Sequence, residues 1–101
     1  MTVAVVFTSR RTLHHEDEYA EMAAEMERMV HEQPGFLRMS SARDPVSREG
    51  ITVAWFVDEE SARAWKQVPE HLAAQRRGVE AFYEEYHVSV AEVVRDYGWR
   101  A

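Results

Sequence analysis

The sequence predicts an α+β fold: a ferredoxin-like four-stranded antiparallel sheet with helices on one face, in the order β-α-β-β-α-β. Three observations predict it. Four runs rich in β-branched and aromatic residues alternate with amphipathic stretches. The two middle runs are separated by a short turn segment, which favours an antiparallel hairpin. The length of 101 residues is that of one domain, and we expect residues 1–101 to form it.

The first strand and the first helix are marked by a change of hydrophobic period. Residues 2–8 are β-branched and apolar on both faces, which is typical of a strand covered on both sides. From about His15 to Glu32 the apolar residues recur at helical spacing, and Pro34-Gly35 ends the pattern. The apolar face of this expected helix comprises Tyr19, Met22, Ala23, Met26, Met29 and Val30.

The remaining elements follow in the same way. Residues 36–43 and 51–57 are the strands of the hairpin, joined by the turn segment 44–50. Asp58 suits the N-cap of a short helix through Lys66. Pro69 suits the first turn of a further helix. Helical spacing continues from there to Tyr83 and Tyr86, with Gly78 as a breaker within it, and residues 87–95 form the last strand.

The expected sheet is apolar on both faces, although helices cover only one of them. One face is expected to carry Val3, Val5, Val53 and Trp55, and the other Ala4, Val6, Ala54 and Phe56. An open apolar face of this size is unusual on a monomer. We therefore expect a homodimer formed through the open sheet face.

Composition and charge exclude several classes of protein. The net charge is −6, which gives no electrostatic basis for binding nucleic acid. No apolar run is long enough to span a membrane, and the N-terminus lacks a signal-peptide pattern. There is no cysteine, and no glycine-rich phosphate or dinucleotide motif. We expect a cytoplasmic protein with no nucleic-acid or membrane partner.

Several segments together are similar to one known family. Gln33-Pro-Gly-Phe36, the strand 51–57, the segment 58–65 ending in Trp65, and then His71 resemble the antibiotic biosynthesis monooxygenase domain family. This resemblance implies a dimeric α+β barrel of ferredoxin-like protomers. The family includes cofactor-independent oxygenases of aromatic polyketides, haem-degrading enzymes and many small proteins of unassigned role.

Individual residues within the resembling segments distinguish between these activities. Trp65 matches the family's helix tryptophan, which lines the pocket between sheet and helices. Ser61 stands where quinone-forming members carry Asn, and Phe7 where haem-degrading members carry Asn. Ala74 and Gln75 occupy the positions of the haem-ligand His. The resemblance therefore favours a monooxygenase-like protein that needs no cofactor and acts on a planar phenol or anthrone.

We expect a catalytic group of His71, Tyr83 and Tyr86, and a substrate-binding group of Trp65, Ser61 and Phe7. His71 is a candidate general base, and the two tyrosines are candidate hydrogen-bond donors to a phenol or quinone oxygen. Ordinary core packing is the commoner role for aromatic residues at such positions and is the alternative for Trp65, Tyr83 and Tyr86. His14, His15 and Glu18 provide too few converging ligands for zinc, so no metal site is expected. The alternatives are a non-catalytic dimeric ligand-binding module and, third, a haem-binding protein.

Overall fold

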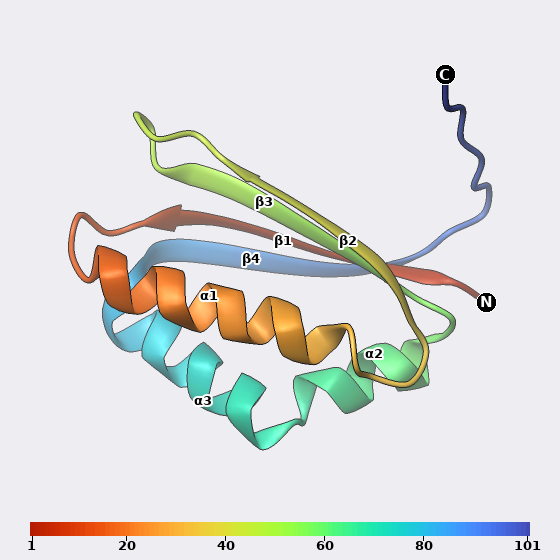
Figure 1. Cartoon of the computed structure of the whole chain (residues 1–101), viewed down its shortest axis with the longest axis horizontal. Helices are drawn as coiled ribbons and strands as arrows, with labels where there is room; N and C mark the ends of the chain where they lie inside the picture. The colour runs from red at the N-terminus through yellow and green to blue at the C-terminus, as the bar shows by residue number, and fades with distance from the viewer.

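The computed structural model describes all 101 residues, and it contains a four-stranded antiparallel sheet with helices packed on one face (Figure 1). The strands are β1 (Val3–Arg11), β2 (Phe36–Arg43), β3 (Glu49–Phe56) and β4 (Tyr83–Glu92), in the order β2-β3-β1-β4. The helices are α1 (Glu16–Val30), α2 (Glu59–Lys66) and α3 (Pro69–Arg77), followed by the π-helical turn η1 (Gly78–Phe82). This arrangement confirms the ferredoxin-like α+β class, and the dimeric barrel stays a prediction.

The helix boundaries follow local chemistry. α1 starts after His15, whose φ of 62° turns the chain, and three acidic residues occupy its first turn. The side chain of Asp58 caps α2 by accepting a hydrogen bond from the backbone N–H of Ser61 at 2.8 Å. Pro69 starts α3. None of the three helices combines the length and the apolar character needed to cross a bilayer.

The core lies between the sheet and the helices, and the pairing of β1 with β3 determines its members. Val3 lies opposite Phe56, and Val5 opposite Ala54, so these four side chains point to the same face. The buried core residues are Val3, Val30, Ala54, Phe56, Ala62 and Trp65. The expectation that Ala54 and Phe56 lie on the face opposite Val3 and Val5 is therefore wrong.

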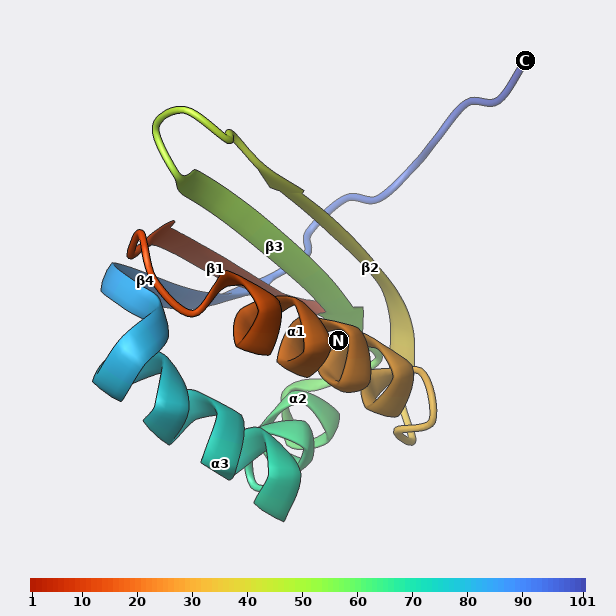
Figure 2. The same cartoon turned by 60° about the vertical axis from the view of Figure 1, so that its left-hand side comes forward.

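The other face of the sheet carries no helix, as the second view makes clear (Figure 2). By the same alternation it presents Ala4 and Val6 from β1 and Ile51, Val53 and Trp55 from β3. Ile51 is 44% exposed, and the other four are half-buried or partly covered by neighbouring side chains. The expected open apolar face is thus present, with a different set of residues from β3.

The first and last strands are longer at one end than the sequence pattern predicts. β1 continues past Thr8 to Arg11, because the polar side chains there find partners at the sheet's end. β4 starts at Tyr83 rather than at His87 and ends at Glu92. Tyr83 and Tyr86 therefore lie on a strand, and the predicted continuation of the helix to them is wrong.

We predict that Gly35→Ala destabilises the fold by at least about 1 kcal/mol. Gly35 has φ 83°, and a Cβ there would lie 2.6 Å from Cβ of Ser61 and 2.9 Å from Cγ2 of Val57. Gly98→Ala is the control, because nothing lies within 4 Å of a Cβ added at that position. Urea unfolding measures both variants, and equal midpoints for the two would contradict the prediction.

Candidate functional site

The predicted site residues form two separate groups on the helix-facing side of the sheet. Trp65 and His71 stack on one another, and Trp65 packs in the core with Val3. Phe7 contacts Tyr83 and Tyr86 further along β1. Phe7 lies four positions after Val3 on the same strand, which is about 13 Å at the usual rise of a strand. The groups are therefore too far apart to contact a single phenol ring together.

The His71 side chain is held in one orientation and in one tautomer. Its ring stacks on that of Trp65 with centroids 4.3 Å apart and an interplanar angle of 15°. Its Nδ1 lies 3.0 Å from the backbone oxygen of Trp65. A carbonyl oxygen only accepts, so Nδ1 carries the proton and Nε2 has the free lone pair. Burial lowers the pKa of His71 below 6.5, and the charge of Lys66 lowers it further, while the hydrogen bond to Trp65 opposes them.

Phe7, Tyr83 and Tyr86 form a compact aromatic group. The ring of Phe7 lies 5.4 Å from that of Tyr83 and 5.5 Å from that of Tyr86. Burial raises the pKa of Tyr83 well above its ordinary value, and the neighbouring Tyr19 on α1 raises it further. The Tyr83 hydroxyl therefore keeps its proton at physiological pH and can act as a hydrogen-bond donor.

A bulge in the β1–β4 pairing brings the two tyrosines to the same face. Ser9 lies opposite Tyr86, Arg10 opposite Glu85, and Arg11 opposite Tyr83, so Glu84 is an extra residue. Without it, residues three apart on a strand would point to opposite faces. The bulge is the reason why Tyr83 and Tyr86 join Phe7, which their spacing in the sequence does not indicate.

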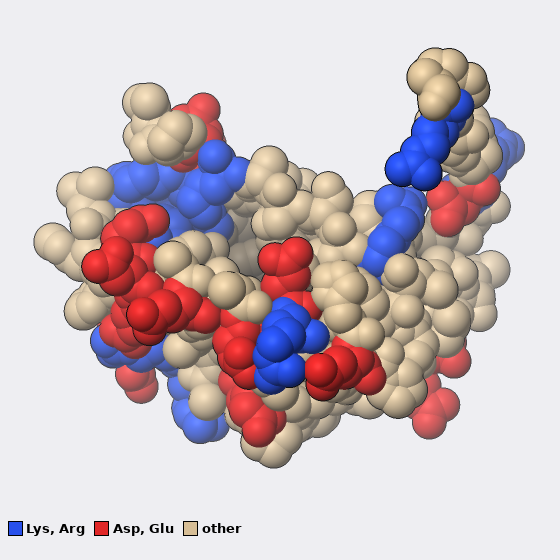
Figure 3. Space-filling view, in the orientation of Figure 1, with Lys and Arg blue, Asp and Glu red and all other residues tan.

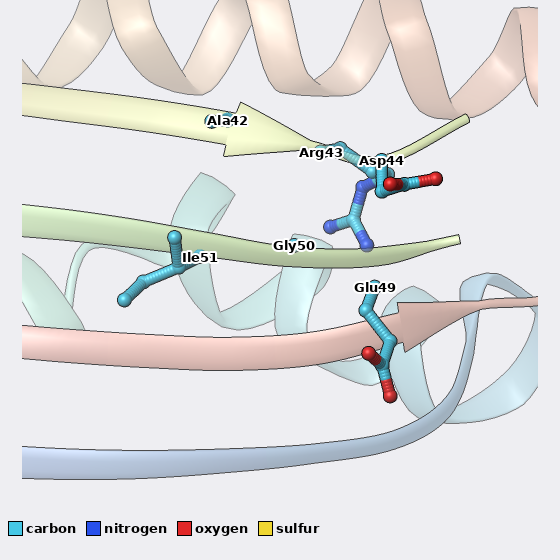
Figure 4. A pocket seen from close by; sticks show the side chains of 6 residues that line it. All are labelled: Ala42, Arg43, Asp44, Glu49, Gly50 and Ile51. Carbon is cyan, nitrogen blue, oxygen red and sulfur yellow. The ribbon is translucent and has the colours of Figure 1, made fainter. Parts of the chain in front are cut away.

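Arg43 is a candidate functional residue that the sequence analysis missed. It extends from β2 across Gly50 of β3 (Figure 4), and its Nη2 donates to Oγ of Ser9 on β1 at 2.8 Å. The same nitrogen lies 3.4 Å from the hydroxyl of Tyr19, which is a long hydrogen bond. A Cβ at Gly50 would lie 2.6 Å from Cζ of Arg43, so glycine leaves the space for this crossing. In the sequence, the signal that could have identified Arg43 is its expected pairing with Gly50 across the hairpin, because glycine has no side chain to block the arginine.

A second arginine supports the same end of the sheet. The side chain of Arg11 is 2% exposed, and its Cζ lies 3.9 Å from the ring centroid of Tyr19. Its guanidinium donates to the backbone oxygens of Phe82 and His14 and to the carboxylate of Glu16. Each of the three guanidinium nitrogens of this buried cation donates one hydrogen bond, which holds Arg11 against the ring of Tyr19.

An exposed apolar strip on β4 starts at Tyr86 of the aromatic group and continues along the strand through Val88 and Val90. Val88 and Val90 lie opposite Phe7 and Val5, so they share the helix-facing side with Tyr86. Tyr86, Val88 and Val90 are 48%, 46% and 53% exposed, although they belong to the covered side of the sheet. Large apolar side chains left open beside a site are suited to holding a flat ligand.

Ser61 lies apart from both groups. It sits against Gly35 in the turn before β2, where its side chain fills the space that a Cβ on that glycine would take. Its backbone N–H is used by the Asp58 cap. The expectation that Ser61 binds substrate stays a prediction, and its contacts are those of a turn residue.

Two hollows lie at the hairpin end of the molecule. One, of about 470 Å³, is lined by Ala42, Arg43, Asp44, Glu49, Gly50 and Ile51. The other, of about 260 Å³, is lined by Arg11, Thr12, Leu13, Glu16, Arg43, Asp44, Pro45 and Arg48. Basic side chains gather here above acidic ones (Figure 3). Arg43 is common to both hollows, and neither reaches His71 or Trp65.

The titratable side chains do not form a metal centre: no three His, Asp or Glu residues come together in a way that could hold an ion. His15 lies 3.6 Å from Glu18 as an isolated pair. Glu18 is itself bound by Arg77 of α3 at 2.6 Å and 2.8 Å, which ties α3 to α1.

Comparison with known proteins gives consistent matches. A family model described as antibiotic biosynthesis monooxygenase matches residues 2–77. The chain is 37% identical over 92 residues to the uncharacterized protein YqjZ of Bacillus subtilis (strain 168), a match that covers 91% of this chain and 79% of that protein.

Solved structures share the fold at low sequence identity. Rv0793 from Mycobacterium tuberculosis superposes with a TM-score of 0.84 at 11% identity, over 97% of this chain and all of that one. SnoaB, a cofactor-independent oxygenase from Streptomyces nogalater, superposes with a TM-score of 0.77 at 17% identity, over 94% of this chain and 95% of that one. At these identities the structural matches show the fold alone.

We predict that the His71 imidazole makes the protein less stable in acid. Because burial lowers the folded-state pKa below 6.5, the stability due to the neutral ring is present above pH 6.5 and is lost as the pH falls through the folded-state pKa. His71→Asn keeps a donor near the Trp65 oxygen but cannot titrate, so its urea midpoint should change less between about pH 7.5 and about pH 5. An NMR titration should place the His71 midpoint below 6.5. A midpoint above that value contradicts the assignment.

Proposed function

Because the chain belongs to the antibiotic biosynthesis monooxygenase family, we propose that it is a cofactor-independent monooxygenase for a planar, polycyclic phenol or anthrone. The observation that carries this proposal is the exposed apolar strip of Tyr86, Val88 and Val90, which starts at the tyrosine donors and runs along β4 toward the end of β1 where Trp65 packs with Val3 and stacks on His71. The spacing of about 13 Å along β1 from Val3, beside Trp65, to Phe7 matches a linear fused-ring compound better than a single phenol.

The roles of the residues follow from their chemistry. Nε2 of His71 would accept a proton from the substrate, because Nδ1 is already occupied by the Trp65 oxygen. Tyr83 would donate to an oxygen at the far end of the ring system, onto which the negative charge of the conjugated anion is delocalised, with Tyr19 and the charge of Arg43 behind it. Phe7 and Tyr86 would stack on the ring system. Trp65, which is 9% exposed, would hold His71 in place.

The reaction balances without a cofactor. Deprotonating an anthrone gives an electron-rich anion that can reduce dioxygen directly. One atom of O₂ enters the new carbonyl group, and the other leaves as water together with the two hydrogens of the methylene carbon. The protein would supply proton removal, oxyanion stabilisation and exclusion of bulk water. SnoaB, described as a cofactor-independent oxygenase, has the same fold and lends support to this chemistry.

We predict that His71→Ala lowers kcat for an anthrone substrate by about 10²–10⁴-fold, because it removes the base. Tyr83→Phe should lower kcat by about 10²–10³-fold, as expected for loss of one oxyanion donor. Oxygen uptake is measured in buffer freed of metals and flavins. His14→Ala is the control, since that side chain is exposed and lies outside both groups.

Two results would change the assignment. Full activity of His71→Ala on a validated substrate would exclude the base. Binding of polycyclic phenols without any oxygen uptake would favour the alternative, a ligand-binding module that does no chemistry. In that case Tyr83→Phe should weaken binding while His71→Ala leaves it largely unchanged.

The open sheet face supports a second part of the proposal, a homodimer formed through this face. The face carries Ala4, Val6, Val53 and Trp55, which no helix of the same chain covers. A second copy would place the same residues against them with two-fold symmetry. Because each protomer buries its open face, the sheets would form the walls of a closed barrel.

We predict that Val53→Asp shifts the protein from dimer to monomer in sedimentation equilibrium at micromolar concentration, because it buries an unpaired carboxylate at the centre of the interface. The control is Val46→Asp in the hairpin turn, where the side chain is 89% exposed. Circular dichroism checks that both variants fold. A wild-type chain that sediments as a stable monomer would rule out the dimer.

A further inference from the structure

We propose that the smaller hollow at the hairpin end, of about 260 Å³, binds a small oxyanion, a carboxylate or a phosphate group, with Arg43 as the principal binding residue. The end of β1, the loop that follows it and the β2–β3 hairpin together form this hollow, so segments far apart in the sequence meet there. The proposal concerns binding alone and does not depend on the proposed oxidation.

Arg43 is a half-buried cation without a counter-ion. No carboxylate of the chain forms an ion pair with it, although it lies partly out of water. The other arginines that are buried or half-buried each pair with a glutamate; they are Arg10, Arg11, Arg48 and Arg77. A charge that is partly removed from water is costly unless an opposite charge compensates it, so an oxyanion bound at Arg43 would be stabilised.

The Arg43 guanidinium also has hydrogen-bond donors to spare. Nη1 donates to the backbone oxygen of Arg48 at 2.7 Å, and Nη2 donates to Oγ of Ser9 at 2.8 Å. The contacts with the backbone oxygen of Ser9 and the hydroxyl of Tyr19 are long, at 3.4 Å each. Nε has no acceptor in the chain and is not enclosed. A guanidinium binds carboxylate and phosphate groups through N–H donors on adjacent nitrogens, and such donors remain available here.

The charge of the lining favours an anion. Arg11, Arg43 and Arg48 line the hollow together with the carboxylates of Glu16 and Asp44, which gives a net charge of +1. Glu16 is already bound to Arg11 at 2.9 Å. Asp44 accepts two backbone N–H groups of the hairpin turn, and these hydrogen bonds lower its pKa. The charge of Arg43 is therefore the one that the lining leaves uncompensated.

The larger hollow beside it does not suit an anion. Arg43 is the only basic residue in that lining, and the carboxylates of Asp44 and Glu49 outnumber it. The two hollows meet at Arg43, so the distribution of carboxylates decides that the smaller one is the oxyanion site.

The arginines of the smaller hollow are held in place by the hairpin turn. Arg48 has φ 67°, which residues other than glycine rarely adopt. Its backbone oxygen accepts from the Arg43 side chain and from the Arg11 N–H. Its guanidinium donates to the Arg11 backbone oxygen and pairs with Glu84 at 2.9 Å. Because these contacts exist without a ligand, little side-chain ordering remains to be paid when an anion binds.

The test titrates sodium phosphate, and separately sodium acetate, into the protein at neutral pH and follows the backbone amide NMR signals. Sodium chloride at equal ionic strength is the reference, because it reproduces general screening of surface charges. We expect saturable shifts confined to residues 11–16 and 43–48, which form the hollow. Competition between the two anions for the same shifts indicates a general oxyanion site, and saturation by one alone assigns the site to that chemical class.

Two variants at the hollow and one control make the titration specific. Arg43→Gln should raise the dissociation constant at least about 10-fold, the effect of losing a charge-assisted hydrogen bond. Arg43→Lys should raise it less, because the charge stays. Arg76→Gln is the control: this arginine of α3 is exposed and lies outside the hollow, so the constant should not change.

Arg48→Gly guards against loss of folding in Arg43→Gln. Glycine adopts φ 67° without strain and keeps the backbone oxygen that Arg43 binds, so the hairpin should stay folded. This variant should raise the dissociation constant at least about 3-fold, because a nearby positive charge is lost. Shifts no larger than those in sodium chloride, or shifts spread over the whole surface, overturn the site. An unchanged constant in both Arg43→Gln and Arg48→Gly also overturns it.

Discussion

The antiparallel pairing of β1 with β3 is the constraint on which the rest of the structure depends. These are the two central strands, and side chains directly opposite each other point to the same face. Placing Val3 opposite Phe56 decides at once which residues meet the helices and which form the open face. A shift by one residue would move Phe56 out of the core and Trp55 into it.

The order of the elements could be predicted from the sequence, because the change between two-residue and helical periods is a local property. The register could not. Both central strands are apolar on both faces, so their alternation does not show which face the helices cover. The tertiary fit decides it: the small Ala54 and the ring of Phe56 pack with Val30, Ala62 and Trp65 beneath the helices.

The candidate site, like the fold, was predictable only where it depends on residues that are close in the sequence. His71 and Trp65 are near in sequence, on either side of the junction between α2 and α3, and their rings contact each other in space. Tyr83 and Tyr86 join Phe7 only because Glu84 is bulged, which depends on pairing with β1 rather than on local spacing. The reach of Arg43 across Gly50 to Ser9 depends on the pairing of β2 with β3 and of β3 with β1, and it is visible only in three dimensions.

The buried charge of Arg11 has a consequence for local unfolding. Phe82 O accepts both the Arg11 guanidinium and the Thr12 N–H, and the same guanidinium also binds the loop before α1. If the π-helical turn η1 separated from the sheet, the buried Arg11 guanidinium would lose its hydrogen bond to Phe82, and an unpaired buried charge is costly. The end of β1, the loop before α1 and the start of β4 thus form one cooperative opening unit, although nearly seventy residues separate its parts. Local unfolding that exposes Tyr83 at the start of β4 must therefore release all three segments together.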